Sequence, residues 1–347
     1  MSVITSTHPI VAAPMAGGPS SVELARAVAQ AGGFPFLAAG YKTVEQLAEQ
    51  VRAARSFGVD FGVNLFVPAS ANDAPTSQEP FDRSAFEAFA DRIAPEAAAL
   101  GVELPREPRT DDDLYTEKLA YLRRNPVPVV SFTFGLSSAQ VIAHLQQVGT
   151  RVLVTVTTAA EAAAAEANGA DGLVVQGPRA GGHSATFDPT RTFGDRPTVE
   201  VLHDILEITQ IPAVAAGGVD SPATARQLLD AGAEAVALGT ALLRTDEAGT
   251  SPTHRAALAD PRFTETVLTS AFTGRPARAL KNEYLQRHHD HAILAYPQVH
   301  HLTKQLRAAA GQAGDAERLH LWAGTGWRAA RAGSARDVIA EFAAQLG

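Results

Sequence analysis

Eight short apolar runs recur along this 347-residue chain, with amphipathic stretches between most of them. Most of these runs are continuously apolar, which is typical of strands that are buried on both faces. They begin near residues 10, 34, 61, 127, 151, 172, 212 and 236. Eight β-α units predict a (β/α)8 barrel, also called a TIM barrel. A doubly wound sheet is the alternative, but the number of runs and the lack of a dominant glycine fingerprint after the first one argue against it.

The stretches between the runs carry signals for the start and the end of helices. Capping-box patterns, with Glu or Gln three residues further on, begin at Ser20, Thr43, Ser137 and Thr158. Ser221 followed by Pro222 has the pattern of an N-cap with proline at the first helical position. Glycines stand where four of the helices should end, at Gly32, Gly149, Gly169 and Gly232. The regular placement of these signals supports the β-α alternation.

Two segments are too long to be simple connections of a barrel. Residues 68–126 follow the third run, and we expect them to form an excursion with one or two helices, such as "SAFEAFADRIAPEAAAL". Residues 251–322 follow the eighth run, and we expect a smaller, mostly helical cap that contributes to substrate binding. The barrel would then comprise residues 1–250 and 323–347.

Charge and composition exclude several classes of function. The formal net charge of −8 argues against nucleic acid or an anionic membrane as a partner. The chain has no cysteine, so disulfides, thiolate metal sites and cysteine nucleophiles are excluded. The N-terminus lacks a basic region followed by an apolar run, and no apolar stretch approaches the roughly 18 residues of a membrane span. We therefore expect a cytoplasmic enzyme that acts on small molecules.

Glycines follow the seventh and eighth runs, where (β/α)8 barrels commonly bind phosphate. Gly217 and Gly218 precede the expected helix start at Ser221, and Gly239 and Thr240 follow the last run. Glycine lets the backbone come close to an anion, and helix N-termini bind phosphate through free N–H groups. These glycines could alternatively serve tight turns alone, but their presence at both expected loops favours a phosphate-bearing ligand across the barrel mouth.

Polar side chains at other strand ends predict the rest of a site. Asn64 lies within "FGVNLFV" and Gln176 ends "GLVVQG", and buried amides of this kind need partners. A ring-shaped cofactor would satisfy both, although neighbouring backbone could do so instead. His183 follows Gly181 and Gly182 in "QGPRAGGHSATFD", which suggests a loop that approaches a ligand and an imidazole suited to proton exchange. A surface position is the alternative for His183. The first run ends in Pro14, Met15 and Ala16.

The histidine-rich stretch "RHHDHAILAYPQVHH" does not have the pattern of a metal site, because adjacent residues on a helix do not face one another. We therefore expect no metal. Tyr296, His300 and Lys304 are spaced four residues apart, which would place a phenol, an imidazole and an ammonium group on one helical face. That face could bind an anionic substrate if it looks into the barrel mouth, or it could be ordinary surface.

Several of these segments together resemble one enzyme family. "PIVAAPMAGGPSSVELARAVAQAGG", "FGVNLFVP", "QGPRAGGHSATFD", "IPAVAAGGVDSPATARQLLDAGAEAVALGTALL" and "TSAFTGRPARALKNEYL" are similar to the nitronate monooxygenases, formerly called 2-nitropropane dioxygenases. The resemblance runs from about residue 8 to residue 310 and is strongest to the bacterial class I enzymes. The Ala-Gly-Gly-His element also occurs in related FMN enzymes, including FMN-dependent enoyl-acyl-carrier-protein reductases.

The resemblance implies FMN as the cofactor and His183 as the catalytic residue beside it. It implies oxidation of alkyl nitronates such as propionate 3-nitronate by O2, through a flavin semiquinone, to a carbonyl compound with nitrite and nitrate. We expect this reaction to serve the detoxification of nitroalkanes, and we expect the enzyme to be a monomer or a homodimer. The cofactor contacts would come from Pro14, Met15, Ala16, Asn64, Gln176, Gly181, Gly182, Gly217, Gly218, Leu238, Gly239 and Thr240. The substrate contacts would come from Thr133, Tyr296, His300 and Lys304.

The chain departs from the family pattern at three positions. Thr133 stands where such proteins often have a histidine, Ala237 where they often have glutamine, and His300 where they often have a second tyrosine. The first and third departures affect the expected substrate pocket. Two other functions stay open at this point. One is an FMN-dependent NAD(P)H reductase acting on an enoyl thioester or a quinone, and the other is a sugar-phosphate barrel or a flavin-binding protein without catalysis.

Overall fold

The predicted barrel is present in the computed structural model, which describes residues 2–74 and 81–346. Eight parallel strands form one sheet in the order β1-β9-β8-β6-β5-β4-β3-β2. A parallel bridge between Val11 and Phe34 brings β1 next to the segment that enters β2, so the sheet closes on itself. The strands are β1 (Ile10–Ala12), β2 (Phe36–Ala38), β3 (Gly62–Phe66), β4 (Val129–Thr133), β5 (Arg151–Val156), β6 (Gly172–Gln176), β8 (Ala213–Ala216) and β9 (Ala235–Leu238).

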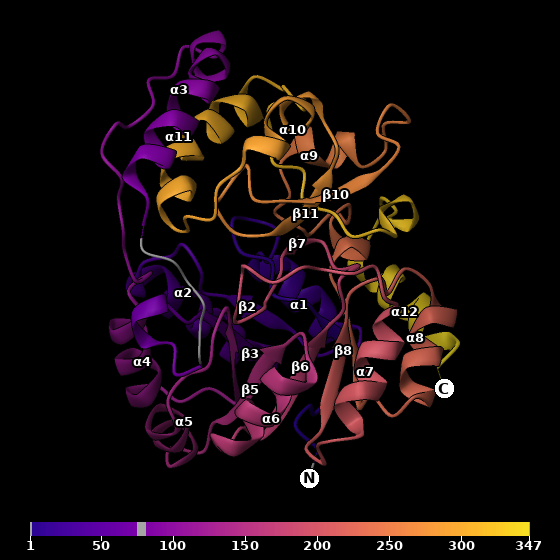
Figure 1. Ribbon diagram of the computed structural model, residues 1–347. Helices are drawn as coiled ribbons and strands as arrows, with labels where there is room; N and C mark the ends of the chain where they lie inside the picture. The colour runs from indigo at the N-terminus through magenta and orange to yellow at the C-terminus, as the bar shows by residue number, and fades with distance from the viewer. Residues whose placement is uncertain (1, 75–80, 347) are drawn as a thin grey trace.

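Eight helices surround the barrel, one after each of its strands (Figure 1). They are α1 (Val22–Gln30), α2 (Val44–Ala54), α4 (Tyr115–Arg124), α5 (Ala139–Gln146), α6 (Ala159–Ala167), α7 (Thr198–Leu206), α8 (Pro222–Asp230) and α12 (Ala335–Ala344). Short 3-10 helices lie at Arg55–Phe57, Ala69–Ala71, Thr240–Leu242, His289–His291 and Trp327–Ala329. The arrangement confirms the (β/α)8 barrel, since every apolar run found in the sequence corresponds to a barrel strand.

The helix boundaries agree with most of the sequence signals. Thr43 forms the full capping box with Gln46, and Ser221 caps α8 with Pro222 at its first turn. Two predicted caps are wrong by one residue, because Ser21 and Ser138 cap α1 and α5. Ser20 instead accepts a hydrogen bond from the main-chain nitrogen of Met15 at 2.8 Å, which fixes the loop after β1. The four glycines predicted to end helices all have a positive φ, namely Gly32, Gly149, Gly169 and Gly232.

A second layer of structure covers one end of the barrel (Figure 1). It contains α9 (Pro252–Ala257), α10 (Glu283–His288), α11 (Gln298–Gln312) and an antiparallel sheet of β10 (Thr266–Thr269), β11 (Ala277–Leu280) and β7 (Gly182–His183). The excursion after β3 contributes α3 (Arg83–Ala99), which packs against α10 and α11, whereas α4 belongs to the barrel. The three-stranded sheet was not expected from the sequence, and it ties the loop after β6 to the cap.

One buried carboxylate fastens α3 to this cap. Glu96 is 6% exposed and accepts hydrogen bonds from Arg287 at 2.7 and 3.1 Å, from His288 at 3.0 Å and from Arg318 at 2.9 Å. A buried carboxylate is tolerated when it is paired and hydrogen-bonded in this way. The α3 part of the excursion therefore packs with the cap. Among the described residues, no helix has the length and apolarity needed to cross a membrane.

Candidate active site

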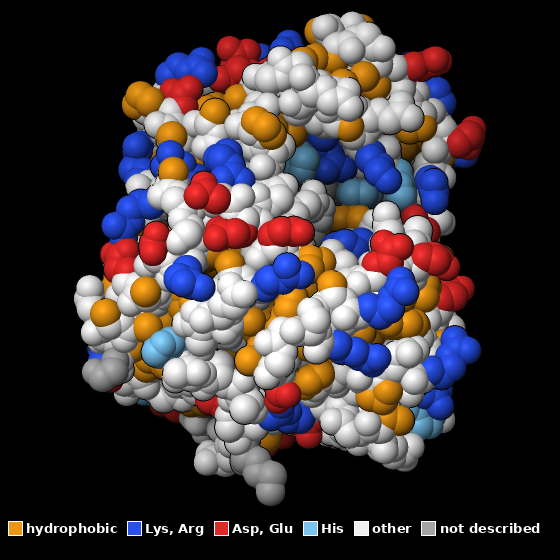
Figure 2. Space-filling model, turned by 180° about the vertical axis from the view of Figure 1, so that it is seen from behind, with side chains coloured by type: hydrophobic (Ala, Val, Ile, Leu, Met, Phe, Trp, Pro, Cys, Tyr) orange, Lys and Arg blue, Asp and Glu red, His pale blue; other side chains and the backbone are white. Residues whose placement is uncertain are grey.

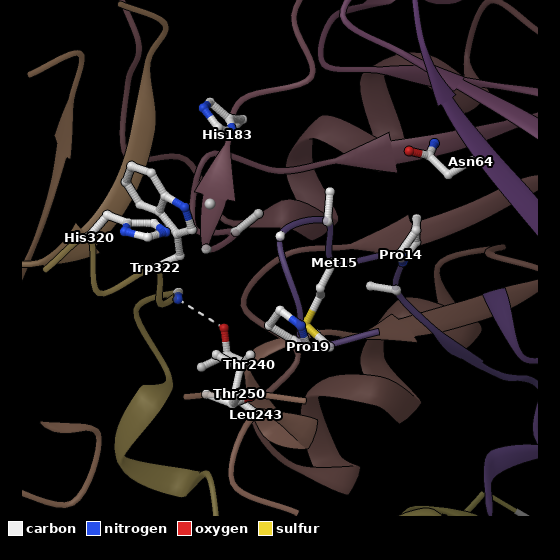
Figure 3. A pocket seen from close by; sticks show the side chains of 18 of the residues that line it. Pro14, Met15, Pro19, Asn64, His183, Thr240, Leu243, Thr250, His320 and Trp322 are labelled. Atoms are coloured by element: carbon white, nitrogen blue, oxygen red, sulfur yellow. Dashed lines mark hydrogen bonds between the residues drawn. The ribbon is translucent and has the colours of Figure 1, made fainter. Parts of the chain in front are cut away.

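A cavity of about 860 Å³ lies between the barrel and the cap, at the carboxyl ends of the barrel strands. The loops after β1, β6, β8 and β9 contribute to its wall, together with α11. Figure 3 shows part of this wall, with Met15, His183 and Thr240 among the labelled residues. Active sites of (β/α)8 barrels lie at this end of the fold. The cavity is lined by the predicted residues Pro14, Met15, Ala16, Asn64, Thr133, Gln176, Gly181, Gly182, His183, Gly217, Gly218, Gly239, Thr240, His300 and Lys304.

Two predicted site residues do not line this cavity. The side chain of Leu238 is fully buried, because it points outward from β9 and packs against the surrounding helices. Its main-chain oxygen accepts a hydrogen bond from Ala13 at 2.9 Å. Tyr296 is not among the lining residues, although its hydroxyl is 3.5 Å from that of Tyr41, which is one of them. The departure at Ala237 does lie in the wall.

Glycines form one side of the cavity, where three loops meet. Gly217 and Gly218 have φ values of 97° and 73°, so both adopt the left-handed conformation that glycine favours. A Cβ atom on Gly181 would lie 2.4 Å from the main-chain nitrogen of Gly324, so this approach of two backbones requires glycine. The hydroxyl of Thr240 accepts a hydrogen bond from the same nitrogen at 2.9 Å (Figure 3). Bare backbone and a hydroxyl next to the start of α8 are the groups that bind a phosphate.

Asn64 is held by hydroxyl groups of the neighbouring strand. Its Nδ2 atom donates to Ser131 Oγ at 2.9 Å and to Thr133 Oγ1 at 2.8 Å. The amide nitrogen is therefore satisfied within the barrel, while the residue as a whole faces the cavity (Figure 3). Thr133, predicted to contact substrate, has a second partner in Thr155 Oγ1 at 3.2 Å. Both side chains are thus oriented before any ligand binds.

Gln176 uses both ends of its amide within its own loop. Nε2 donates to the main-chain oxygen of His183 at 3.1 Å, and Oε1 accepts from the main-chain nitrogen of Ala185 at 2.8 Å. Neighbouring backbone therefore satisfies this amide, which is the alternative that the sequence left open. Gln176 also lines the cavity, so it lies between the barrel and the segment that carries His183.

His183 lies on β7 and is enclosed by aromatic rings. Its Nε2 atom is 2.9 Å from Thr273 Oγ1, and its ring centroid is 5.3 Å from Trp322 and 5.5 Å from Phe134. Burial lowers the pKa of His183 to about 3, and the positive charges of Arg275 and Arg307 lower it in the same direction. The imidazole is therefore neutral at physiological pH, and the surface position considered for it is excluded.

Two buried arginines give this part of the site a positive charge. Arg275 is 6% exposed and Arg307 is 7% exposed. Glu161 and Asp188 act electrostatically on Arg275, whereas only tyrosines act on Arg307 within the described part of the chain. Arg275 donates to the main-chain oxygens of Ser184 and Phe134, and its guanidinium lies 4.2 Å from the centre of the Phe134 ring. Figure 2 shows a hollow in the upper half of the molecule where His, Lys and Arg side chains gather. This environment favours an anion.

The face of α11 that lines the cavity extends beyond the predicted residues. The helix begins at Gln298, so Tyr296 precedes it, but the ring of Tyr296 still contacts that of His300, with centroids 6.1 Å apart. Arg307 lies three residues beyond Lys304 and also lines the cavity. The same spacing argument could have found Arg307, which was not among the predicted site residues. Tyr41, Phe66, Phe134, Thr273, His320 and Trp322 were also missed, because they come from loops whose paths the sequence does not reveal.

The histidine-rich stretch has no metal-binding arrangement. His288 is bonded to Glu96, and His301 Nε2 is 2.9 Å from Asp111. Over residues 2–74 and 81–346, no group of three or more His, Asp or Glu side chains is placed to hold a metal ion.

Comparisons with known proteins agree on one family. The model of the family described as "Nitronate monooxygenase" matches residues 1–345. A protein of Staphylococcus aureus (strain Newman) named "Probable nitronate monooxygenase" is 31% identical over 99% of this chain and 96% of its own length. A nitroalkane oxidase from Streptomyces ansochromogenes is 46% identical, with a TM-score of 0.91 over 98% of this chain and 96% of that one. FabK from Thermotoga maritima shares the fold, with a TM-score of 0.75 at 22% identity over 99% of this chain and 94% of that one.

Proposed function

Because the chain belongs to the nitronate monooxygenase family of oxidoreductases, we propose that it uses FMN to oxidise alkyl nitronates with O2. Propionate 3-nitronate is the type of substrate we propose, and the products are a carbonyl compound with nitrite and nitrate. When bound, FMN supplies the redox group that passes electrons from the substrate to oxygen, by the one-electron route that the resemblance implies.

The glycine-lined side of the cavity supports the choice of a phosphate-bearing cofactor. Gly181, Gly217 and Gly218 line the cavity without a side chain, and the N-terminus of α8 would add its dipole. The loop from Pro14 to Ala16 and the side chain of Asn64 line the same cavity further along. These residues would hold the phosphate at one end and the ring system over the barrel mouth.

The observation that carries the proposal is the unpaired positive charge around a neutral histidine. Arg307 interacts with tyrosines and with no carboxylate among the described residues, and both Arg307 and Lys304 line the cavity itself. A nitronate is an anion, so it would provide the missing negative charge. A neutral nitroalkane would not provide it.

The environment of His183 supports an orienting role over that of a base. A histidine with a pKa of about 3 is a weak proton acceptor at neutral pH, since general bases work best when their pKa lies near the working pH. It could still hold a nitronate through a hydrogen bond. We therefore propose that nitronates, which are already ionised, are better substrates than neutral nitroalkanes, whose α-proton would have to be removed first.

The anaerobic absorption spectrum of the purified, FMN-loaded protein tests this function. One sample receives propionate 3-nitronate and another receives NADH and NADPH. We expect a spectral change of the flavin with the nitronate alone and none with the nicotinamides. Full bleaching by a nicotinamide without a response to nitronate would instead identify an NAD(P)H-dependent reductase. A colourless protein that regains no flavin on incubation with FMN would indicate a barrel for another phosphate-bearing ligand.

The domain boundaries, a cytoplasmic location and a monomeric or homodimeric state stay predictions from the sequence.

A further inference from the structure

Arg307 and His300 form a hydrogen-bonded pair on the face of α11 that lines the cavity. Arg307 Nη2 lies 3.2 Å from His300 Nδ1 and donates to the main-chain oxygen of His300 at 3.0 Å. Arg307 Nε donates to Thr303 Oγ1 at 3.0 Å, so the guanidinium is anchored to its own helix. Its position relative to the imidazole is therefore fixed by local helix geometry.

The chemistry of the two groups determines where the imidazole proton lies. A guanidinium carries only donors, so His300 Nδ1 must act as the acceptor of this contact. A neutral imidazole that accepts at Nδ1 carries its proton on Nε2. His300 Nε2 makes no hydrogen bond within the described residues, and His300 lines the cavity. The ring thus offers an unused N–H donor there.

The orientation of the imidazole is fixed from its other side by Tyr41. The two rings are stacked with centroids 4.4 Å apart and an angle of 5° between their planes. Tyr41 has a φ of 64°, and its main-chain nitrogen donates to Asp113 Oδ1 at 2.8 Å. Asp113 is in turn paired with the fully buried Lys118 at 2.7 Å. The unusual backbone of Tyr41 therefore has support from a buried ion pair.

The groups around His300 keep its ring neutral. Burial lowers the pKa of His300 well below its ordinary value, and the charge of Arg307 is the next cause. His301 and Lys304 on the same helix and His183 on β7 lower it further. The other titratable groups near the ring are Tyr41, Tyr296 and His320. Protonation at Nδ1 would also break the hydrogen bond with Arg307.

We propose that His300 binds an oxygen of the anionic substrate through Nε2–H, and that Arg307 is the positioning residue that commits His300 to this tautomer. The identity of the anion as a nitronate rests on the proposed function. Lys304 and Arg307 supply the positive charge on the same helical face, and His300 supplies a directed donor. This assigns a role to the position at which the resembling proteins often have a second tyrosine.

Nuclear magnetic resonance of protein labelled with ¹⁵N at histidine tests the tautomer without any substrate. The signals of His300 are identified by their loss in His300→Gln. We expect wild-type His300 to show the Nε2–H tautomer and no titration between about pH 5 and 9. In Arg307→Met we expect mixed tautomers and a pKa closer to the ordinary value. An Nδ1–H tautomer in the wild type, or a titration near neutrality, would overturn the proposal even if the variant fails to fold.

Kinetics with propionate 3-nitronate test the role of the donor. His300→Phe keeps a ring to stack on Tyr41 and removes the donor, whereas His300→Gln keeps an N–H group near the position of Nε2. We expect the KM of His300→Phe to rise about 10- to 100-fold, with a smaller change in kcat and unchanged FMN content, because a hydrogen bond to a charged group is lost. We expect His300→Gln to stay within about 5-fold of the wild type.

The outcomes separate this inference from the proposed function. If the wild type oxidises nitronates and His300→Phe has an unchanged KM, His300 does not bind the substrate and the inference fails. If the wild type does not react with nitronates while the resonance data show a fixed Nε2–H tautomer, the proposed function fails and the pairing of Arg307 with His300 stands.

Discussion

The side chain of Gln176 donates a hydrogen bond to the main-chain oxygen of His183 at 3.1 Å. Its other end accepts from Ala185 at 2.8 Å, so one amide at the end of β6 bridges the segment that carries the histidine. The β7 strand pairs with β11 in the cap, with His183 opposite Ala277. His183 is therefore held from the barrel by Gln176 and from the cap by a strand pairing, and its position depends on both layers of the molecule.

Replacement of Gln176 by leucine should displace His183. The change leaves the main-chain groups of His183 and Ala185 without these partners, and an unsatisfied buried group costs about 1–3 kcal/mol. We expect the free energy of unfolding to fall by this amount and kcat to fall about 10-fold or more. The measurements are chemical denaturation and steady-state kinetics with propionate 3-nitronate.

The control for this prediction is Gln146→Ala. Gln146 also donates to a main-chain oxygen, that of Gly169, at 2.8 Å, but on the exposed outside of the barrel. We expect its kcat to remain at the wild-type value. If Gln176→Leu also keeps the wild-type kcat, the tether does not position His183.

His183→Ala should keep FMN and lose most turnover. His183 lies among aromatic rings at the cavity, and none of the glycines assigned to the phosphate depends on its side chain. Flavin content is measured by absorbance after denaturation, and turnover by oxygen consumption. Unchanged turnover would show that His183 does not take part. Loss of the flavin as well would show that its role is to support the cofactor.

Buried histidines should make the protein less stable as the pH falls from 7.5 to 5. Burial lowers the pKa of His183 to about 3 and that of His254 to about 4, whereas an unfolded histidine titrates near 6.5. Because the folded pKa is the lower one, the unfolded chain takes up protons first. The stability that His183 and His254 contribute is therefore fully present above about pH 6.5. It is lost as the pH falls toward their pKa values in the folded protein, by up to about 1.4 kcal/mol per pH unit for each group.

Urea denaturation at pH 7.5 and pH 5 measures this loss. His254→Gln is the informative variant, because His254 lies outside the proposed catalytic group and contacts the main-chain oxygen of Trp322 at 3.0 Å. We expect this variant to lose less stability between the two pH values than the wild type does. Equal losses in the two proteins would contradict the assignment.

Gly218→Val should abolish the binding of FMN. Gly218 has a φ of 73°, and a Cβ atom there would lie 3.2 Å from Arg179 Cβ, on the side of the cavity assigned to the phosphate. A branched side chain would strain the backbone and cover its N–H groups.

Gly149→Val is the matched control, since Gly149 has a φ of 86°, has open space around it and lies outside the cavity. Both variants should lose stability, but only Gly218→Val should lose the flavin. Stoichiometric FMN in Gly218→Val would refute the placement.

The sequence predicted the barrel well because local signals determine it. Buried parallel strands leave continuous apolar runs, and glycines such as Gly149 end helices in a conformation that other residues avoid. Local signals also located His183 and the glycine loops, since barrel sites lie at known strand ends. They could not place Arg275 or Tyr41, whose positions depend on how the cap meets the barrel. They placed Tyr296 within the helix, whereas α11 begins at Gln298 and Tyr296 contacts His300 from the segment just before it.

Glu96→Ala should weaken the attachment of α3 to the cap. The variant leaves Arg287, His288 and Arg318 without the carboxylate that they share, and we expect a loss of about 2–3 kcal/mol, since two of these partners are partly exposed. Burial acts to raise the pKa of Glu96, but the hydrogen bonds from Arg287 and His288 outweigh it, so the folded pKa is lowered. The contribution of Glu96 should therefore be present above the ordinary pKa of a glutamate and should be lost as the pH falls through the lowered value.

Glu283→Ala is the control for this prediction. Glu283 pairs with the same Arg287 at 2.9 Å, but its side chain is 55% exposed, so we expect a cost below about 0.5 kcal/mol. Hydrogen exchange of the amides of α3, followed at neutral pH, separates local loosening from global unfolding. We expect faster exchange in α3 for Glu96→Ala and wild-type exchange for Glu283→Ala. If α3 exchanges equally slowly in both variants, apolar packing against α10 and α11 holds the excursion, because Glu96 would then contribute nothing to its attachment.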